Sequence, residues 1–340
     1  MKACRIVFLF LCSLVCFHAA AQDTTDYDFA IEAGRVTITG YHGQTTELII
    51  PREVQGMPVV SIGYGAFMDG RLVRVTIPNS VTTIGDKAFF NNRLIAVTFG
   101  SGLTDIGYKS FAGNSLMALT LPRGLQRIGN GAFYDNRIPR VVISDNVTAI
   151  GSEAFAQNRL TRLTLGRGIS RLEDSVFANN RLQRVYIPGG ITKIGSRAFA
   201  GNQLNDLRLP KGLREIDSWA FADNELLQVE IPDDVTVIHY KAFANNKITA
   251  LSLGIGLTVI RDSAFENNRI SRVDIGAGVR EIGGMAFGGN LLTEVVIPDN
   301  VSTLGPNAFG DEPVIYTYGG RVMVSQRELE AALQKRIRRE

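Results

Sequence analysis

The sequence predicts a repeat solenoid of about 12 in-phase units of 22 residues, with a parallel β-sheet on one face and short helical or 3₁₀ turns on the other. Three features carry this prediction: a column of phenylalanines, an asparagine three residues after most of them, and a strand-like apolar alternation between them. A fixed period of this size is typical of solenoids, because a single unit of this length cannot bury its apolar face alone. The column takes 12 of the 18 phenylalanines, namely Phe67, Phe89, Phe111, Phe133, Phe155, Phe177, Phe199, Phe221, Phe243, Phe265, Phe287 and Phe309.

The first half of each unit has the pattern of a β-strand with one buried face. In the unit that begins at Leu182, the apolar residues Val185 and Ile187 flank the variable Tyr186. Residues two apart point to the same side of a strand, so this alternation places one face toward a core. The same pattern recurs at 75–77, 97–99, 119–121, 163–165, 207–209, 229–231 and 273–275. In seven copies a proline follows and ends the strand by removing a backbone donor.

The second half of each unit has apolar residues at spacings of three and four, which predict a short helical or 3₁₀ turn opposite the strand. A glycine such as Gly85 or Gly195 follows the last isoleucine of most units, and we expect it to ease a tight turn. Glu173 and His239 replace it in other units, so a positive φ is not obligatory at that position.

The asparagine column predicts a structural ladder rather than a row of ligands. An amide at the same bend of every rung can bond the backbone groups that the bend leaves unpaired. The column consists of Asn92, Asn114, Asn136, Asn158, Asn180, Asn202, Asn224, Asn246, Asn268 and Asn290.

Together these columns form the pattern LxxVxIPxxITxIGxxAFxxNx, which resembles the BspA-like leucine-rich repeat, also called the Treponema pallidum type. The resemblance covers residues 47–310, and the stretch TTELIIPREVQGMPVVSIGYGAF at 45–67 resembles the usual entry into such an array. One departure is visible, since the family often has cysteine where this chain has its asparagines. The resemblance implies a secreted or surface-exposed protein that binds host matrix components, host cells or other bacteria. It implies no shared catalytic residue.

Residues 1–21 have the features of a secretory signal peptide. Lys2 and Arg5 supply positive charge before an apolar run over 6–17, and three alanines at 19–21 supply small residues for cleavage. The apolar run is too short to span a bilayer. We therefore expect export, with cleavage after Ala21, to the medium or the outer surface, and the periplasm is the alternative.

All three cysteines lie within this segment, at Cys4, Cys12 and Cys16, so the mature chain has neither a disulfide nor a thiol nucleophile. Lipidation at Cys16 is an alternative to simple cleavage, although Val15 is bulkier than the residue that normally precedes a lipidated cysteine.

Each end of the array needs a cap, because an open apolar rung would aggregate. We expect residues 22–46 to form a hairpin-like N-terminal cap ahead of the solenoid at 47–310. Residues 311–340 are expected to form a last strand over 314–318 and a basic amphipathic helix that begins with the capping box at 325–328. The pattern leaves open whether this helix closes the stack or protrudes, and it predicts no transmembrane segment in the mature chain.

Composition and motifs argue against catalysis. Without Lys2 and Arg5 the chain has 34 basic and 33 acidic residues, which does not fit a general nucleic-acid binder. The two remaining histidines, His42 and His239, are far apart in a linear array, and no glycine-rich segment completes a phosphate-binding motif. We therefore expect no enzyme, no cofactor, no metal site and no specific nucleic-acid partner. The alternative is an enzyme whose active site is hidden in the repeat loops.

One charged feature stands out, because the position after the asparagine column is basic in seven of eleven copies, once after Gly70 in place of the asparagine, and another basic residue often follows three residues later. In three consecutive copies both positions hold arginine, which gives the arginine strip: Arg137, Arg140, Arg159, Arg162, Arg181 and Arg184. Arg184 shares its outward face with Tyr186. Guanidinium groups pair with carboxylate, phosphate or sulfate, so we expect a protein or acidic glycan as partner. The alternative is that these arginines only solubilise a turn edge. A second alternative function is a structural or periplasmic envelope component with an endogenous protein partner.

Overall fold

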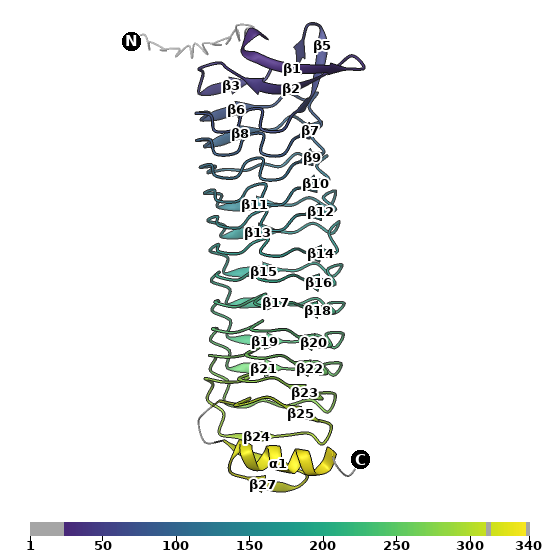
Figure 1. The fold of residues 1–340 in the computed structure, drawn as a ribbon, viewed down its shortest axis with the longest axis vertical. Coiled ribbons are helices and arrows are strands. Elements are labelled where there is room, and N and C mark those ends of the chain that lie inside the picture. The colour runs from purple at the N-terminus through teal and green to yellow at the C-terminus, as the bar shows by residue number, and fades with distance from the viewer. Residues whose placement is uncertain (1–23, 311–313, 338–340) are drawn as a thin grey trace, which may run out of the picture.

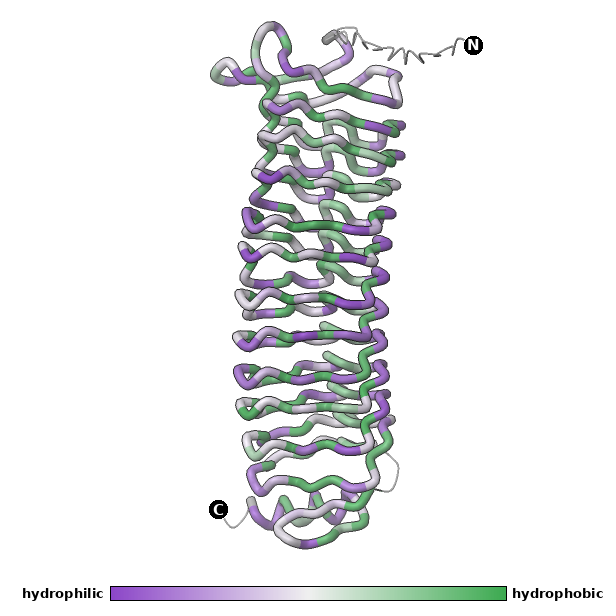
Figure 2. The backbone as a smooth tube through the Cα atoms, turned by 180° about the vertical axis from the view of Figure 1, so that it is seen from behind, coloured by the Kyte–Doolittle hydropathy of each residue, from purple (hydrophilic) through white to green (hydrophobic). Residues whose placement is uncertain are grey.

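The computed structural model describes residues 24–310 and 314–337, and the expected signal peptide at 1–21 lies outside them. The chain winds into one straight stack of rungs, with β1 and β2 across the first rung and α1 across the last (Figure 1). Hydrophilic and hydrophobic segments recur at matching places on successive rungs and so form columns along the stack (Figure 2). The predicted repeat solenoid with a parallel sheet on one face is confirmed.

One face carries a ladder of three-residue strands, paired in parallel with the next rung wherever hydrogen bonds join them. These strands are β3 (Glu47–Ile49), β6 (Arg74–Thr76), β8 (Ala96–Thr98), β11 (Arg140–Val142), β13 (Arg162–Thr164), β15 (Arg184–Tyr186), β17 (Asp206–Arg208), β19 (Gln228–Glu230), β21 (Ala250–Ser252) and β24 (Glu294–Val296). The six strands with a predicted range, β6, β8, β13, β15, β17 and β19, each begin one residue earlier than the alternation predicted. At 119–121 and 273–275 the first and third side chains face the core as predicted, but no strand is formed.

The opposite face differs from the short helical turns expected there, because it carries a second parallel ladder. Its strands are β5 (Met57–Ile62), β7 (Thr83–Ile84), β9 (Asp105–Ile106), β10 (Arg127–Ile128), β12 (Ala149–Ile150), β14 (Arg171–Leu172), β16 (Lys193–Ile194), β18 (Glu215–Ile216), β20 (Val237–Ile238), β22 (Val259–Ile260), β23 (Glu281–Ile282) and β25 (Thr303–Leu304). Each is followed by hydrogen-bonded turns rather than a helix, and no helix forms between residues 27 and 310, all of which the structure describes.

Left-handed residues explain why these turns do not continue as helices. After β7, Ala88 N–H donates to the Gly85 carbonyl and Phe90 N–H donates to the Lys87 carbonyl, at 3.3 and 3.0 Å. Lys87 and Asn91 both have a φ of 55°, and equivalent positions on other rungs share this conformation. A residue in the left-handed region interrupts the right-handed dihedrals that a helix needs, so each turn ends after one hydrogen bond.

The core is a stack of phenylalanine rings. From Phe67 to Phe309 the rings of successive rungs lie parallel, with centroids 4.9–5.8 Å apart and interplanar angles of 1–20°. Phe89 to Phe287 are fully buried. Stacked rings of this kind add to the burial of their apolar area, so the column gives one continuous apolar contact from rung to rung.

The asparagine column is the predicted ladder. Asn180 accepts a hydrogen bond from Leu160 N–H on the preceding rung at 2.9 Å. Its amide donates to the carbonyls of Phe155 and Phe177, at 2.9 and 3.1 Å. The same pattern recurs from Asn92 to Asn290, and these amides are buried or nearly so. Each amide therefore supplies the bonds that the bend leaves unmade, both within a rung and between two rungs.

The glycine that follows the second strand has a different role from the one expected. Gly85 does not have a positive φ, and an added Cβ would lie 2.8 Å from the carbonyl carbon of Gly63 and the carbonyl oxygen of Ile62. The residue is small because the preceding rung approaches closely, not because the turn needs a left-handed residue.

The first rung is covered by an antiparallel hairpin of β1 (Tyr27–Glu32) and β2 (Arg35–Tyr41), preceded by the 3₁₀ turn η1 (Thr24–Asp26). β2 pairs in parallel with β5, and β4 (Glu53–Val54) pairs antiparallel with β5. The rings of Tyr27 and Tyr41 continue the phenylalanine stack toward this end, with Tyr41 5.5 Å from Phe67. Burial raises the pKa of Tyr27 above its usual value.

The last rung is covered by β26 (Ile315–Tyr318), β27 (Arg321–Met323) and α1 (Gln326–Ile337). Ser325 Oγ accepts from Glu328 N–H at 3.3 Å, and the Glu328 carboxylate accepts from Val324 N–H at 3.0 Å, which forms the expected capping box with its return bond one residue earlier. Leu329 and Leu333 are buried. The helix therefore closes the stack rather than protruding; the side chain of Ile337, expected on the same stripe, lies outside the described residues.

Candidate interaction surface

The arginine strip lies along the edge and the outer face of the first ladder. Arg140, Arg162 and Arg184 are the first residues of β11, β13 and β15, and their partners three residues earlier lie in the bend that leads into each strand. Val141, Leu163 and Val185 follow them and turn toward the core. Because side chains alternate along a strand, the arginines point outward. All six arginines are exposed.

None of the six arginines forms an ion pair with a described carboxylate. Elsewhere in the same two columns pairing does occur, since Arg74 contacts Glu47 at 3.3 Å and Lys247 contacts Glu225 at 3.3 Å. Within the strip, Arg140 and Arg162 are direct partners in the parallel ladder. Without carboxylate partners, the strip is a cationic surface. Like charges at adjacent strand positions are also destabilising, so this arrangement costs stability.

Two large apolar side chains lie among these charges. Tyr186 is 73% exposed and Val142 is 63% exposed, each two residues after an arginine of the strip. A tyrosine within a patch of arginines is a composition enriched at the centres of protein interfaces. The sequence pattern identified Tyr186 but not Val142, because valine in a strand is ordinarily attributed to β-propensity.

The strip is bounded on both sides. Toward the C-terminus Asp206 is the ladder partner of Arg184, and Arg208 is the partner of Tyr186, so uniform positive charge ends at β17. Toward the N-terminus a depression of about 440 Å³ opens beside Arg140 and Arg162, where Ala118 takes the column position. The depression could not be predicted from Ala118 alone, because residues from several rungs line it.

The described residues contain no group of three or more histidine, cysteine, aspartate or glutamate side chains that could hold a metal ion. His42 contacts Asp28 at 2.6 Å in the N-terminal cap, far along the chain from His239. Two pairs of adjacent acids, at 173–174 and 233–234, contain residues with structural partners: Glu173 accepts from Arg171 at 2.9 Å, and Asp233 accepts from Ile255 N–H at 3.1 Å. These contacts give both acids a structural role in the part of the chain that the structure describes.

The fold defines a leucine-rich-repeat solenoid. Residues 60–183 and 192–315 match the BspA type Leucine rich repeat region in six copies, so the chain belongs to this family. Proteins of this kind are generally non-catalytic scaffolds for protein–protein interaction or a surface role.

Solved structures share the architecture at low sequence identity. A leucine-rich repeat protein from Bacteroides ovatus matches with a TM-score of 0.61 and 24% identity over 81% of each chain. A leucine rich cell surface protein from Faecalibacterium prausnitzii matches with a TM-score of 0.50 and 22% identity over 90% of this chain and 95% of its own. The pneumococcal vaccine antigen PcpA matches with a TM-score of 0.51 and 17% identity over 86% of each chain. At these identities the likeness shows the fold alone.

A search of curated proteins found no match. In the stretches 24–310 and 314–337, no helix combines the length and the apolar character that crossing a membrane requires.

Proposed function

We propose that this protein is exported and non-catalytic, and that it adheres through the arginine strip to an acidic protein surface or acidic glycan on host matrix, host cells or other bacteria. Six guanidinium groups on three rungs, at strand spacings of roughly 5 Å, present a repeating array of paired donors. Single exposed ion pairs are weak, so only the cluster is expected to give measurable affinity.

The observation that carries the proposal is the absence of internal partners for the strip. Arg74 and Lys247 occupy the same columns and are neutralised by carboxylates from neighbouring rungs, whereas none of the six strip arginines has such a partner among the described residues. Single arginines elsewhere in these columns are also unpaired, but only the strip has arginine in both columns on three consecutive rungs. A solubilising role would not require like charges on adjacent rungs, which cost stability. Tyr186 adds an exposed ring on which a partner can pack.

Export is supported by the signal-peptide features of residues 1–21. The structure from F. prausnitzii is described as that of a cell surface protein, which agrees with this location.

The proposal is tested by changing Arg140, Arg162 and Arg184 together to glutamate. Chains that start at residue 22 are coupled to beads, and the beads are counted on immobilised matrix and on host cells. We expect the triple variant to lose attachment while its circular dichroism and melting stay those of the parent, because these side chains lie outside the core. The matched control is Arg272→Glu, an exposed and isolated member of the same column, which should bind like the parent. If the triple variant attaches like the parent, the proposal is wrong and the arginines only solubilise the turn edge.

Location is tested separately by adding a protease to intact cells that produce the protein. Digestion of intact cells is expected for a surface protein. Digestion that needs permeabilisation would instead favour the periplasmic alternative with an endogenous partner.

A further inference from the structure

The outer face of the first ladder is interrupted at the depression beside the arginine strip, which we call the strip depression. No strand forms at residues 118–121, and none of these four residues makes a backbone hydrogen bond to another described residue. The N–H groups of Met117 and Thr161 donate to the preceding rung at 3.1 and 2.8 Å, but Pro139, at the equivalent position between them, has no N–H to donate. Together with the small side chain of Ala118, this break leaves a space of about 440 Å³.

The lining of the strip depression combines apolar and cationic side chains. Met117 is 53% exposed, and Leu119 and Pro139 contribute further apolar surface. Arg140 and Arg162 also line the space, together with two threonines. Neither arginine forms an ion pair with a described carboxylate. The space therefore accepts an apolar group that lies next to negative charge.

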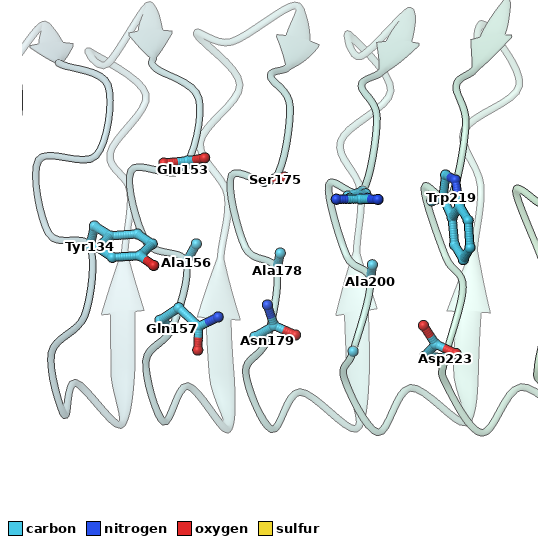
Figure 3. A pocket seen from close by; sticks show the side chains of 12 residues that line it. Tyr134, Glu153, Ala156, Gln157, Ser175, Ala178, Asn179, Ala200, Trp219 and Asp223 are labelled. Carbon is cyan, nitrogen blue, oxygen red and sulfur yellow. The ribbon is translucent and has the colours of Figure 1, made fainter.

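The strip depression differs in charge from four other depressions of the described surface. A groove on the turn edge of the stack has Glu153 and Asp223 in its lining (Figure 3). A depression of about 810 Å³ on the outer face of the first ladder is lined by Asp206, Glu230 and Asp274, among others. Those of about 600 and 300 Å³ also contain carboxylates. Since no described carboxylate lines the strip depression, it alone among these five is complementary to an acidic partner.

We propose that the strip depression takes one apolar side chain of an acidic protein segment, whose carboxylates pair with the arginine strip. This inference rests on the proposed function, and it selects a protein segment over a glycan. An acidic glycan presents hydroxyl and charged groups along its length and has no apolar side chain to fill the space. A polypeptide can place an apolar side chain beside carboxylates, so it gains both the burial of apolar area and the ion pairs.

The spacing of the rungs predicts how the residues of the partner are arranged. Strands are roughly 5 Å apart, so Arg140, Arg162 and Arg184 lie about 5, 10 and 15 Å along the stack from Ala118. Alternate side chains of an extended segment that runs along the stack are about 6.8 Å apart and share one side. With the apolar residue at Ala118, the residue two positions away lies between Arg140 and Arg162. The residue four positions away lies between Arg162 and Arg184, so carboxylates at these two positions each meet two guanidinium groups.

The experiment measures, by calorimetry, the affinity of the chain from residue 22 for a synthetic peptide. The probe has nine residues, with leucine at the centre, glutamate two and four residues away on both sides, and serine elsewhere. This symmetry allows it to bind in either chain direction. A second peptide has alanine in place of the leucine. We expect the leucine peptide to bind about tenfold more tightly, as expected for burying part of one leucine side chain.

Two variants locate the leucine. Ala118→Gln fills the strip depression with a neutral side chain and should lower the affinity for the leucine peptide about tenfold, to that of the alanine peptide. Because the six arginines remain, its affinity for heparin should be that of the parent. Ala250→Gln is the matched control, because Ala250 is exposed and begins β21 in the same column, away from the strip. It should bind the peptides and heparin like the parent.

The proposed function and this inference fail in different ways. If the Arg140, Arg162 and Arg184 triple glutamate variant binds the peptides and heparin like the parent, the strip is not the binding site and both are wrong. If that variant loses binding but the two peptides bind the parent equally, only the inference is overturned. The same holds if Ala118→Gln binds the leucine peptide like the parent, or if the parent binds heparin but neither peptide. Weaker heparin binding by Ala118→Gln would place a sugar in the depression and overturn the choice of a protein segment.

Discussion

Replacing Asn180 by alanine tests how the rungs are held together. Its side chain is only 7% exposed and bonds Leu160 N–H at 2.9 Å, the Phe155 carbonyl at 2.9 Å and the Phe177 carbonyl at 3.1 Å. Alanine leaves Leu160 N–H without its partner, whereas the Phe155 and Phe177 carbonyls keep the bonds from Asn158 and Asn202, at 3.2 and 3.0 Å. An unsatisfied buried group costs about 1–3 kcal/mol. Water that enters the vacated space recovers part of the loss. We expect the variant to lose about 2 kcal/mol of unfolding free energy, which is within the range for one unsatisfied group.

The assay is urea unfolding followed by circular dichroism, combined with hydrogen exchange at the Leu160 amide. That amide should exchange faster in the variant, because its acceptor is the Asn180 side chain. Asn179→Gly is the matched control, because Asn179 is exposed and has a φ of 55°. Two other rungs have glycine at the equivalent position, Gly113 and Gly201. It should change stability by no more than about 0.5 kcal/mol. An Asn180 variant with parent-like stability and Leu160 exchange would refute the ladder.

Three further predictions concern packing and the C-terminal cap. Gly85→Ala should destabilise by about 1–3 kcal/mol, because its Cβ would lie 2.8 Å from the Gly63 backbone, whereas Gly189→Ala has open space around it and should be near neutral in the same melt. Ser110→Ala should stabilise by about 1 kcal/mol, since Ser110 is fully buried and its hydroxyl has no described partner; a lower melting temperature would contradict this. Burial raises the pKa of Tyr316, so above about pH 10 the unfolded chain loses this proton while the folded chain keeps it, and stability falls with rising pH. Tyr316→Phe should reduce that fall, and an unchanged alkaline melting profile would count against it.

Much of the fold could be predicted from the sequence because the repeat has no insertions. The 22-residue period fixes the alignment of rungs, so the burial of Phe177 and the bonds of Asn180 followed from position alone. The second ladder could not be predicted, since two-residue strands such as Thr83–Ile84 are too short to show an alternation. The left-handed residues were also hidden: Lys87 has no turn signature, and its conformation is imposed by the rungs on either side.

The site could be predicted only in part. Two arginine columns at a fixed spacing imply neighbours on one face, and Arg140 and Arg162 are indeed ladder partners. Ion pairing could not be predicted, because it depends on which carboxylate lies within reach on the next rung, as for Arg74 and Glu47.

The most direct test of the proposed function is the affinity of the mature chain for a sulfated glycan, heparin, measured over a range of salt concentrations. If the arginine strip binds, the affinity of the parent should fall steeply as salt rises past the physiological range, where screening acts within about 8 Å. The Arg140, Arg162 and Arg184 triple glutamate variant should show no binding at any salt concentration, and Arg272→Glu should follow the parent. Equal affinities and equal salt dependence of the parent and the triple variant would contradict the account.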